Sequence, residues 1–163
     1  MKKIIIIGKK SFIGSNLFYY FKKKKIKVNT FTLSQFCNLS ENFLKNYKYI
    51  INCSIHRYYV KSKYDKKFDF DYLVAKKIFN LKCSQILLSS RTVYKPSNNI
   101  TESSKLLPTT QYSKNKVITE KKLLAMLGKR VLILRISNLI GMNTNYKKSI
   151  CHFKARKKLR LTT

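Results

Sequence analysis

The sequence predicts an α/β fold, a doubly wound parallel sheet with helices on both faces, and three observations support this prediction. The β-branched run Ile4–Ile7 is fully apolar, which is typical of a strand buried on both faces of a parallel sheet. Gly8 ends the run, and the spacing of Ile13, Leu17 and Phe21 after it is helical. Strand-like and helical segments then alternate as far as residue 136, as βαβ units require.

In the first half of the chain, the patterns predict strands at 4–7, 27–31 and 49–53 and helices at 14–24 and 39–47. The lysines at 22–25 suit the C-terminal end of the first helix, where the helix dipole favours cations. Asn38 or Ser40 is expected to cap the second helix. Residues 56–64 are interpreted as a polar, aromatic loop, in which His56 faces solvent.

In the second half, helices are expected at 65–81 and 109–127, and strands at 85–90 and 130–136. The first of these helices carries Asp65 and Asp69 near its N-terminal end, and Gly128 suits the C′ position of the second. The predicted core-facing residues of the two helices are Phe68, Tyr72, Ala75 and Phe79, then Val117, Leu124 and Leu127.

The composition of this 163-residue chain indicates one domain with a substantial core, since 44% of its residues are hydrophobic. No apolar run is long enough to predict a membrane span, and the N-terminal apolar run is too short for a signal peptide. The cysteines, Cys37, Cys53, Cys83 and Cys151, are scattered, and two lone histidines add no metal-ligand spacing. We therefore expect no metal site and a reducing, cytoplasmic location.

The formal net charge is +30, from 36 basic and 6 acidic residues. Such a balance raises nucleic acid as a partner. However, the lysines are spread through the whole chain rather than gathered in one stripe, so we expect no specific nucleic-acid binding. The positive field should instead attract anionic small molecules.

The turn after the first strand carries a family resemblance. Its sequence from Gly8 to Gly14, GKKSFIG, resembles the GxxGxxG fingerprint of the short-chain dehydrogenase/reductase superfamily, particularly the extended branch of nucleotide-sugar epimerases and dehydratases. Ser11 replaces the middle glycine, and its Cβ should weaken the approach of a pyrophosphate to the backbone. The resemblance implies a Rossmann fold whose turn binds the cofactor through Gly8, Ser11, Phe12, Ile13 and Gly14.

The same resemblance implies NAD or NADP as the cofactor. In the family an acidic residue at the end of the second strand often holds the adenosine ribose, and Thr32 or a near neighbour stands at that position here. No acid lies between Lys22 and Gln35, and no arginine lies nearby. The choice between NAD and NADP therefore stays open.

Two further motifs resemble the catalytic segments of this branch. Residues 89–94, SSRTVY, are similar to its SSxxVYG segment, in which Ser90 takes the place of the catalytic hydroxyl and Lys95 replaces the final glycine. Tyr112 and Lys116 match its YxxxK motif. The same spacing follows Tyr19, Tyr20, Tyr59 and Tyr72. Context distinguishes Tyr112, which shares a spaced set with the family: Glu102, Pro108, Tyr112, Lys116, Glu120 and the RxxNxxG residues Arg135, Asn138 and Gly141.

The residue types suit this chemistry. Residues four apart share a helix face, so Lys116 can stand beside Tyr112. A free phenol has a pKa of about 10, and a neighbouring ammonium favours its ionised form. By resemblance, Tyr112 would exchange a proton with a sugar hydroxyl during hydride transfer, and Ser90 would donate a hydrogen bond to the same oxygen. Lys116 would also contact the nicotinamide ribose.

The domain organisation predicted is a Rossmann domain at 1–142 and a basic tail at 143–163, the remnant of a missing substrate domain. Three functions stay open: an NAD(P)-dependent nucleotide-sugar epimerase, dehydratase or reductase; a truncated, noncatalytic dinucleotide-binding remnant; and a basic nucleic-acid-binding module. The partners expected are a nucleotide sugar and a second copy of the chain in a candidate homodimer, with no membrane.

Overall fold

The computed structural model describes residues 3–97, 99–137 and 139, and a parallel sheet of five strands forms its centre. The strand order is β2-β1-β3-β4-β5, and all neighbouring strands are parallel. The strands are β1 (Ile4–Ile7), β2 (Val28–Phe31), β3 (Tyr49–Asn52), β4 (Ser84–Ser90) and β5 (Val131–Ile136). Each agrees with its predicted range to within one residue at either end.

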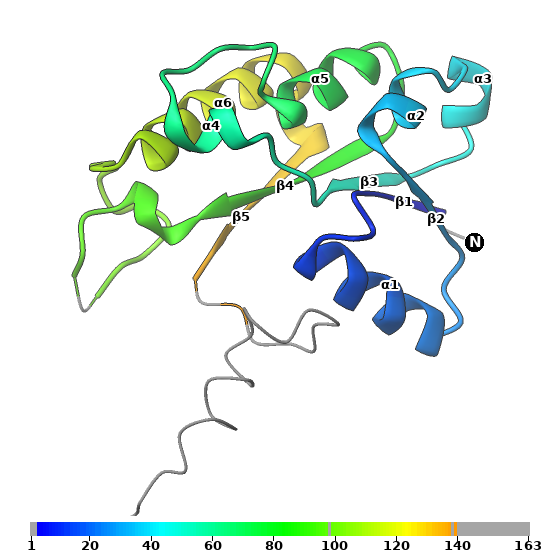
Figure 1. The fold of residues 1–163 in the computed structure, drawn as a ribbon, viewed down its shortest axis with the longest axis horizontal. Coiled ribbons are helices and arrows are strands. Elements are labelled where there is room, and N and C mark those ends of the chain that lie inside the picture. Colours follow the sequence, from blue (N-terminus) through cyan, green and yellow to red (C-terminus); the bar gives the residue numbers. More distant parts are fainter. Residues whose placement is uncertain (1–2, 98, 138, 140–163) are drawn as a thin grey trace, which may run out of the picture.

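Helices cover both faces of the sheet, which confirms the doubly wound α/β fold. Helix α1 lies on one face, and α5 and α6 lie on the other (Figure 1). The helices are α1 (Phe12–Lys23), α2 (Leu33–Cys37), α3 (Glu41–Leu44), α4 (Arg57–Lys61), α5 (Phe70–Lys77) and α6 (Gln111–Leu127). Two 3-10 turns, η1 (Arg91–Val93) and η2 (Gly128–Arg130), complete the described elements.

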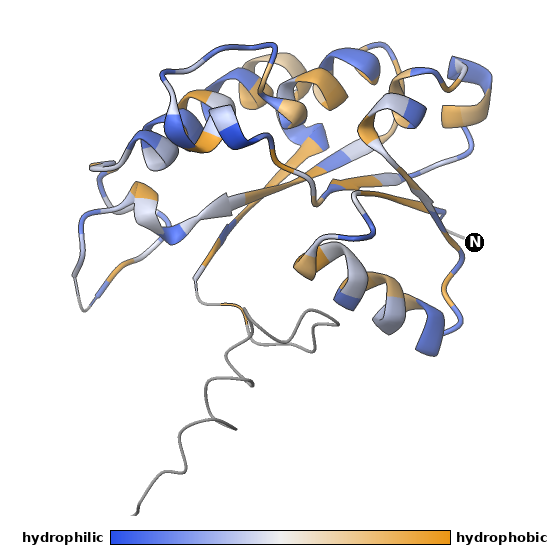
Figure 2. Ribbon diagram, viewed as in Figure 1, coloured by the Kyte–Doolittle hydropathy of each residue, from blue (hydrophilic) through white to orange (hydrophobic). Residues whose placement is uncertain are grey.

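The main core lies between the sheet and the helices α2, α3, α5 and α6. Ile5 and Ile7 of β1 belong to this core, whereas Ile6, also fully buried, is on the other side of the strand because side chains alternate. Strands β1 and β3 are apolar along nearly their whole length (Figure 2). This continuous run is why the first strand was recognisable from sequence.

The predicted loop at 56–64 is wrong, because residues Arg57–Lys61 form helix α4. The helix is held by contacts distant in sequence. Tyr59 is buried, and the Asn115 side chain donates hydrogen bonds to the carbonyl oxygens of Tyr59 and Ser62. His56 is half-buried rather than facing solvent, and its Nδ1 caps the helix by accepting from the Tyr58 amide.

Other helix predictions also need correction. The helix expected at 65–81 extends only over Phe70–Lys77, with Asp69 as its N-cap, and the 39–47 segment forms a single turn capped by Ser40. Helix α2 was not predicted. Phe79 and Leu124, both expected in the core, are each 49% exposed. The predicted tail at 143–163, together with Asn138, Gly141 and Cys151, lies outside the described residues.

Candidate active site

The turn between β1 and α1 is built around two close backbone approaches. Gly8 has φ +85°, and a Cβ there would lie 2.9 Å from the Cβ of Ser54. A Cβ on Gly14 would lie 2.3 Å from the carbonyl oxygen of Gly8. Both positions therefore need glycine, and the turn packs tightly between the end of β3 and the start of α1.

Ser11 is the N-cap of α1 and has an extended backbone, with φ −72°. Its hydroxyl accepts a hydrogen bond of 3.0 Å from the Gly14 amide. Phe12 and Ile13 follow as the first helical residues, whose amides have no partner within the helix. A phosphate could therefore bind at this helix N-terminus, which lies at the carboxyl edge of a parallel sheet. One of the amide donors there, that of Gly14, is already engaged by the Ser11 oxygen.

The residues at this turn fit a dinucleotide in donor type, because the first amides of α1 suit a phosphate. The glycine pair packs the turn against Cys53 and Ser54, directly after β3, at the carboxyl edge of the sheet. Thr32, at the end of β2, caps α2 through a reciprocal hydrogen-bond pair with Gln35. Neither Thr32 nor Gln35 carries a charge that would discriminate between the adenosine ribose of NAD and the ribose phosphate of NADP.

Tyr112 and Lys116 lie together on α6, which begins at its N-cap Thr110. Tyr112 is half-buried, and Lys116 is only 4% exposed. The Lys116 ammonium is 5.9 Å from the centre of the Tyr112 ring and 5.4 Å from that of Tyr59. The lysines of the other YxxxK spacings are all exposed, namely Lys23, Lys24, Lys63 and Lys76. Burial therefore sets the Tyr112–Lys116 pair apart from the matches that composition alone produces.

An acidic partner of Lys116 was not anticipated from the sequence. Asp71 of α5 forms an ion pair with it, with 3.2 Å between Nζ and Oδ2. Burial lowers the pKa of Lys116, but the nearby anionic groups, Asp71 first among them, outweigh this effect and the pKa lies above its ordinary value. A signal was present, because Asp71 shares a helix face with Val74, Ala75 and Ile78, which are buried. A carboxylate on such a face needs a buried partner.

A polar network connects this ion pair to the glycine turn. The Asn52 amide group donates to Asp71 Oδ1 at 3.1 Å, and its own oxygen accepts from the amide and hydroxyl of Ser54. Ser54 is the residue that a Cβ on Gly8 would touch. The network therefore runs from the turn, along the end of β3, to the lysine on α6.

Ser90 ends β4 and caps the turn η1. Its hydroxyl lies 2.9 Å from that of Thr92 and accepts a hydrogen bond from the Thr92 amide. Helix α6 packs against η1, which brings the helix of Tyr112 beside the end of β4. Among the described side chains, no hydrogen bond joins Ser90 to Tyr112 or Lys116.

The remaining motif residues form a second cluster around Arg135 of β5. Its guanidinium pairs with Glu120 of α6 at 2.7 Å and also donates to the Tyr94 hydroxyl and the Glu102 carbonyl oxygen. Glu120 also accepts from the hydroxyl of Ser89. Several residues of the spaced set are thus structural partners that fix α6 against β4 and β5.

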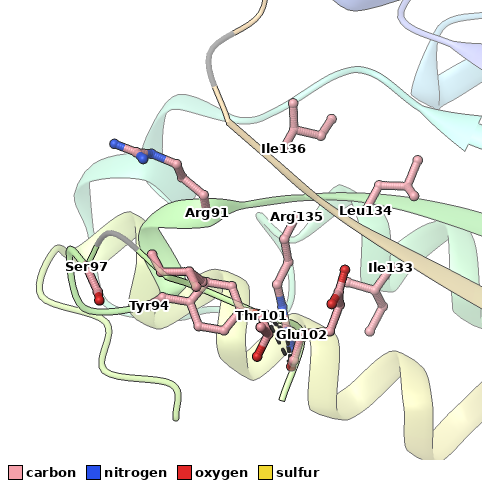
Figure 3. Close-up of a pocket in the computed structure, with 10 residues that line it drawn as sticks. Arg91, Tyr94, Ser97, Thr101, Glu102, Ile133, Leu134, Arg135 and Ile136 are labelled. Carbon is pink, nitrogen blue, oxygen red and sulfur yellow. Dashed lines mark hydrogen bonds between the residues drawn. The ribbon is translucent and has the colours of Figure 1, made fainter. Parts of the chain in front are cut away.

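A cavity of about 650 Å³ lies on the outer side of this cluster (Figure 3). Residues of the loop after β4, including Arg91, Tyr94 and Ser97, line it together with β5. Arg135 reaches from β5 toward Tyr94 and Glu102, whereas Arg91 extends away from them (Figure 3). Tyr112 and Lys116 do not line this cavity, so the candidate catalytic pair is separate from it.

Two further properties concern cofactors and membranes. In the described ranges, no group of three or more histidine, cysteine or acidic side chains is placed to hold a metal ion. Cys37, Cys53 and Cys83 are free thiols. Within the same residues, every helix is too short or too polar to cross a bilayer.

Comparison with protein families gives a match over almost the whole chain. Residues 4–161 match the family described as "NAD dependent epimerase/dehydratase family". A sequence search of curated proteins gave no significant match.

Solved structures with similar folds include three enzymes of different activity. The dTDP-4-dehydrorhamnose reductase from Bacillus anthracis, solved with NADP, has a TM-score of 0.75 at 17% identity, over 96% of this chain and 59% of its own. An NAD-dependent NDP-hexosamine 5,6-dehydratase involved in tunicamycin biosynthesis has a TM-score of 0.70 at 17% identity, over 91% of this chain and 58% of its own. The UDP-N-acetylglucosamine 4-epimerase from Bacillus cereus gives 0.67 at 18% identity, over 90% and 59%. The chain spans less than two thirds of the length of each, and at these identities the likeness establishes the fold.

Proposed function

The chain belongs to the NAD-dependent epimerase/dehydratase family, and we propose that it acts in NAD(P)-dependent hydride transfer on a nucleotide sugar, as an epimerase, dehydratase or reductase. The observation that carries the proposal is the buried Lys116 ammonium beside the Tyr112 ring on α6. A charged lysine is rarely buried without a task or a partner. Its partner here is Asp71, and its position one helical turn from Tyr112 in a family motif supports a catalytic role.

The glycine turn is the proposed site of the dinucleotide. Gly8 and Gly14 allow the close backbone approaches, and the amides of Phe12 and Ile13 with the Ser11 hydroxyl would face the pyrophosphate. Lys116 would contact the nicotinamide ribose. When bound, NAD or NADP would supply the hydride acceptor or donor.

In the proposed mechanism, the Tyr112 hydroxyl exchanges a proton with a sugar hydroxyl as hydride moves. The positive charge of Lys116 stabilises the ionised phenol during this exchange. Ser90 donates a hydrogen bond to the reacting sugar oxygen as negative charge develops on it, which requires its hydroxyl to turn from Thr92 toward the substrate. The basic surface of the chain would favour the approach of an anionic nucleotide sugar.

The substitution Tyr112→Phe tests this proposal. It keeps the ring and its packing against Tyr59 but removes the ionisable oxygen. Loss of a positioned acid–base group typically lowers the rate by about 10²–10⁴-fold. The measurement is turnover of the dinucleotide with a panel of nucleotide sugars, with dinucleotide affinity determined in parallel by calorimetry. The affinity should change little, because the phenol oxygen serves the substrate.

The matched control is Tyr72→Phe, since Tyr72 and Lys76 have the same spacing but Lys76 is exposed. If both folded variants lose the same activity, the assignment of Tyr112 is wrong. If the wild-type chain binds dinucleotide and turns over no nucleotide sugar, it is a noncatalytic dinucleotide-binding protein. If it binds no dinucleotide, the proposed function fails altogether.

A further inference from the structure

We propose that Asp71 is a positioning residue of this site, whose carboxylate holds the Lys116 ammonium in place beside Tyr112 and keeps it charged. The inference rests on the proposed function, because it deepens the role given there to Lys116. Asp71 acts through Lys116 and is not itself a catalytic residue.

The first step is the burial of the pair. The side chains of Lys116 and Asp71 are only 5% and 7% exposed, and 3.2 Å separates Nζ from Oδ2. Taking an ammonium out of water is costly, and the attraction of a close carboxylate compensates only in good geometry. Without Asp71, an uncompensated Lys116 would release its proton or turn toward water.

The second step is the fixed position of the carboxylate. Each oxygen of Asp71 has a different partner, since Oδ1 accepts from Asn52 and Oδ2 from Lys116. The Asp71 carbonyl oxygen accepts a bond of 3.0 Å from the Gln85 side chain, so β3 and β4 both locate this residue. The carboxylate is therefore a rigid support, and it directs the ammonium rather than merely neutralising it.

The third step is the surroundings of the ammonium. The other titratable groups that face it or Asp71 are Tyr112 of α6, Tyr59 of α4, Asp69 at the start of α5, and Cys53 after β3. Burial raises the pKa of Tyr59, and it raises that of the Cys53 thiol to about 12, so both stay neutral near neutral pH. The Asp69 carboxylate is bonded to Thr119, Tyr64 and the Tyr72 amide. Asp71 is thus the anion in direct contact with Lys116.

The experiment follows the ammonium itself, in the chain without dinucleotide. Nuclear magnetic resonance of ¹⁵N-labelled lysine side chains, with Lys116→Met used to assign the signal, gives the pH at which Lys116 loses its proton. In the wild type it should stay charged beyond the range in which an ordinary lysine loses its proton, because Asp71 raises its pKa. In Asp71→Asn, which keeps the shape and removes the charge, the midpoint should fall by roughly three pH units, because a buried ammonium without a counter-charge loses its proton readily.

The control is Glu120→Gln, which removes another buried carboxylate, one that lies on α6 itself and pairs with Arg135 rather than Lys116. Its Lys116 midpoint should match the wild type. An unchanged midpoint in Asp71→Asn overturns the proposal. If Asp71→Asn does not fold, the double variant Asp71→Asn with Lys116→Met should fold, because it no longer buries an unpaired charge. A double variant that also fails to fold overturns the proposal.

Dinucleotide affinity, measured by calorimetry from about pH 6 to about pH 9, separates this inference from the proposed function. In Asp71→Asn the affinity should fall by roughly tenfold and become pH-dependent as Lys116 deprotonates, whereas the wild type should be flat. Asp71→Glu should restore the flat profile. A wild type that binds no dinucleotide refutes the proposed function, and the lysine titration then decides the role of Asp71 by itself. A flat profile in Asp71→Asn at wild-type affinity refutes the positioning role.

Discussion

The Ser11 hydroxyl accepts a hydrogen bond from the Gly14 amide, a donor that a bound phosphate could otherwise use. We predict that Ser11→Gly tightens dinucleotide binding, because the change removes the Cβ and frees that amide. The loss of the N-cap hydroxyl should destabilise α1 by only a few tenths of a kcal/mol, about the usual cost of a serine-to-glycine change at this position. Calorimetric titration with NAD and with NADP provides the measurement.

Ser11→Ala separates the two causes, since it frees the Gly14 amide but keeps a Cβ. Tightening in glycine alone identifies the steric effect, and tightening in both identifies the freed donor. Equal or weaker binding in a folded Ser11→Gly variant contradicts the prediction.

Asp69 predicts a pH dependence of stability. Burial raises its pKa above the ordinary value despite the hydrogen bonds it accepts. Between the ordinary carboxyl pKa of about 4 and the raised value, the native state holds a proton that the unfolded chain has released. The free energy of unfolding therefore falls as pH rises through this window. Asp69→Asn, which preserves a good N-cap, should remove this fall.

Urea denaturation of wild type and Asp69→Asn across acidic to neutral pH provides the check. The stability of the variant relative to wild type should increase as pH rises through the window. A difference that stays constant, or that changes in the opposite direction, shows that Asp69 does not take up a proton on folding.

Single residues were predictable where the signal was local in sequence. Tyr112 and Lys116 are four residues apart, so their shared helix face followed directly from helical geometry. Asp71 lies 45 residues from Lys116, and only the packing of α5 against α6 brings them together. Sequence spacing alone could not predict the contact between Asp71 and Lys116. A carboxylate on an otherwise buried helix face nevertheless indicates that a cation is buried beside it.

At the level of elements, the sequence pattern predicted that α6 packs Leu124 into the core, but the structure packs Leu123 there instead. Leu123 is fully buried and Leu124 is 49% exposed. Leu123→Ala should therefore lower the free energy of unfolding by about 2–5 kcal/mol. Leu124→Ala, the neighbouring control, should change it by less than about 0.5 kcal/mol. Chemical denaturation of both variants tests this orientation of the helix, and similar losses would contradict it.

Strands were easier to predict than short helices for a physical reason. The clearest strand, β1, is a continuous apolar run in which Ile5, Ile6 and Ile7 are fully buried, so its own sequence carries the signal. Helix α4 is one short element that could not be stable alone. It depends on the burial of Tyr59 and on the Asn115 side chain of α6, and neither contact is visible in its own sequence.

For the whole molecule, the burial of acidic residues makes the surface more basic than the net charge alone indicates. Of the 6 acidic residues, Asp69, Asp71 and Glu120 are buried, which leaves few anions among the many basic groups on the surface. Repulsion among these surface cations should destabilise the fold at low ionic strength. The melting temperature should rise as sodium chloride increases from about 0.01 M to about 0.5 M, since salt screens this repulsion.

Calorimetry at fixed pH in sodium chloride and in an equal ionic strength of sodium sulfate provides the measurement. Both salts should raise the melting temperature. A melting temperature that stays constant or falls in sodium chloride would contradict the idea that surface repulsion limits stability.

The strand order also carries a consequence for the sequence of events in folding. Parallel neighbouring strands cannot be joined by a tight turn, so each strand pair can form only when the chain between the two strands closes a long loop. The pair of β1 and β2, in which Ile4 meets Val28, closes the shortest of these loops, while Gln85 and Val131 of β4 and β5 close the longest. Because closing a longer loop costs more entropy, β1 and β2 should pair before β5 joins β4.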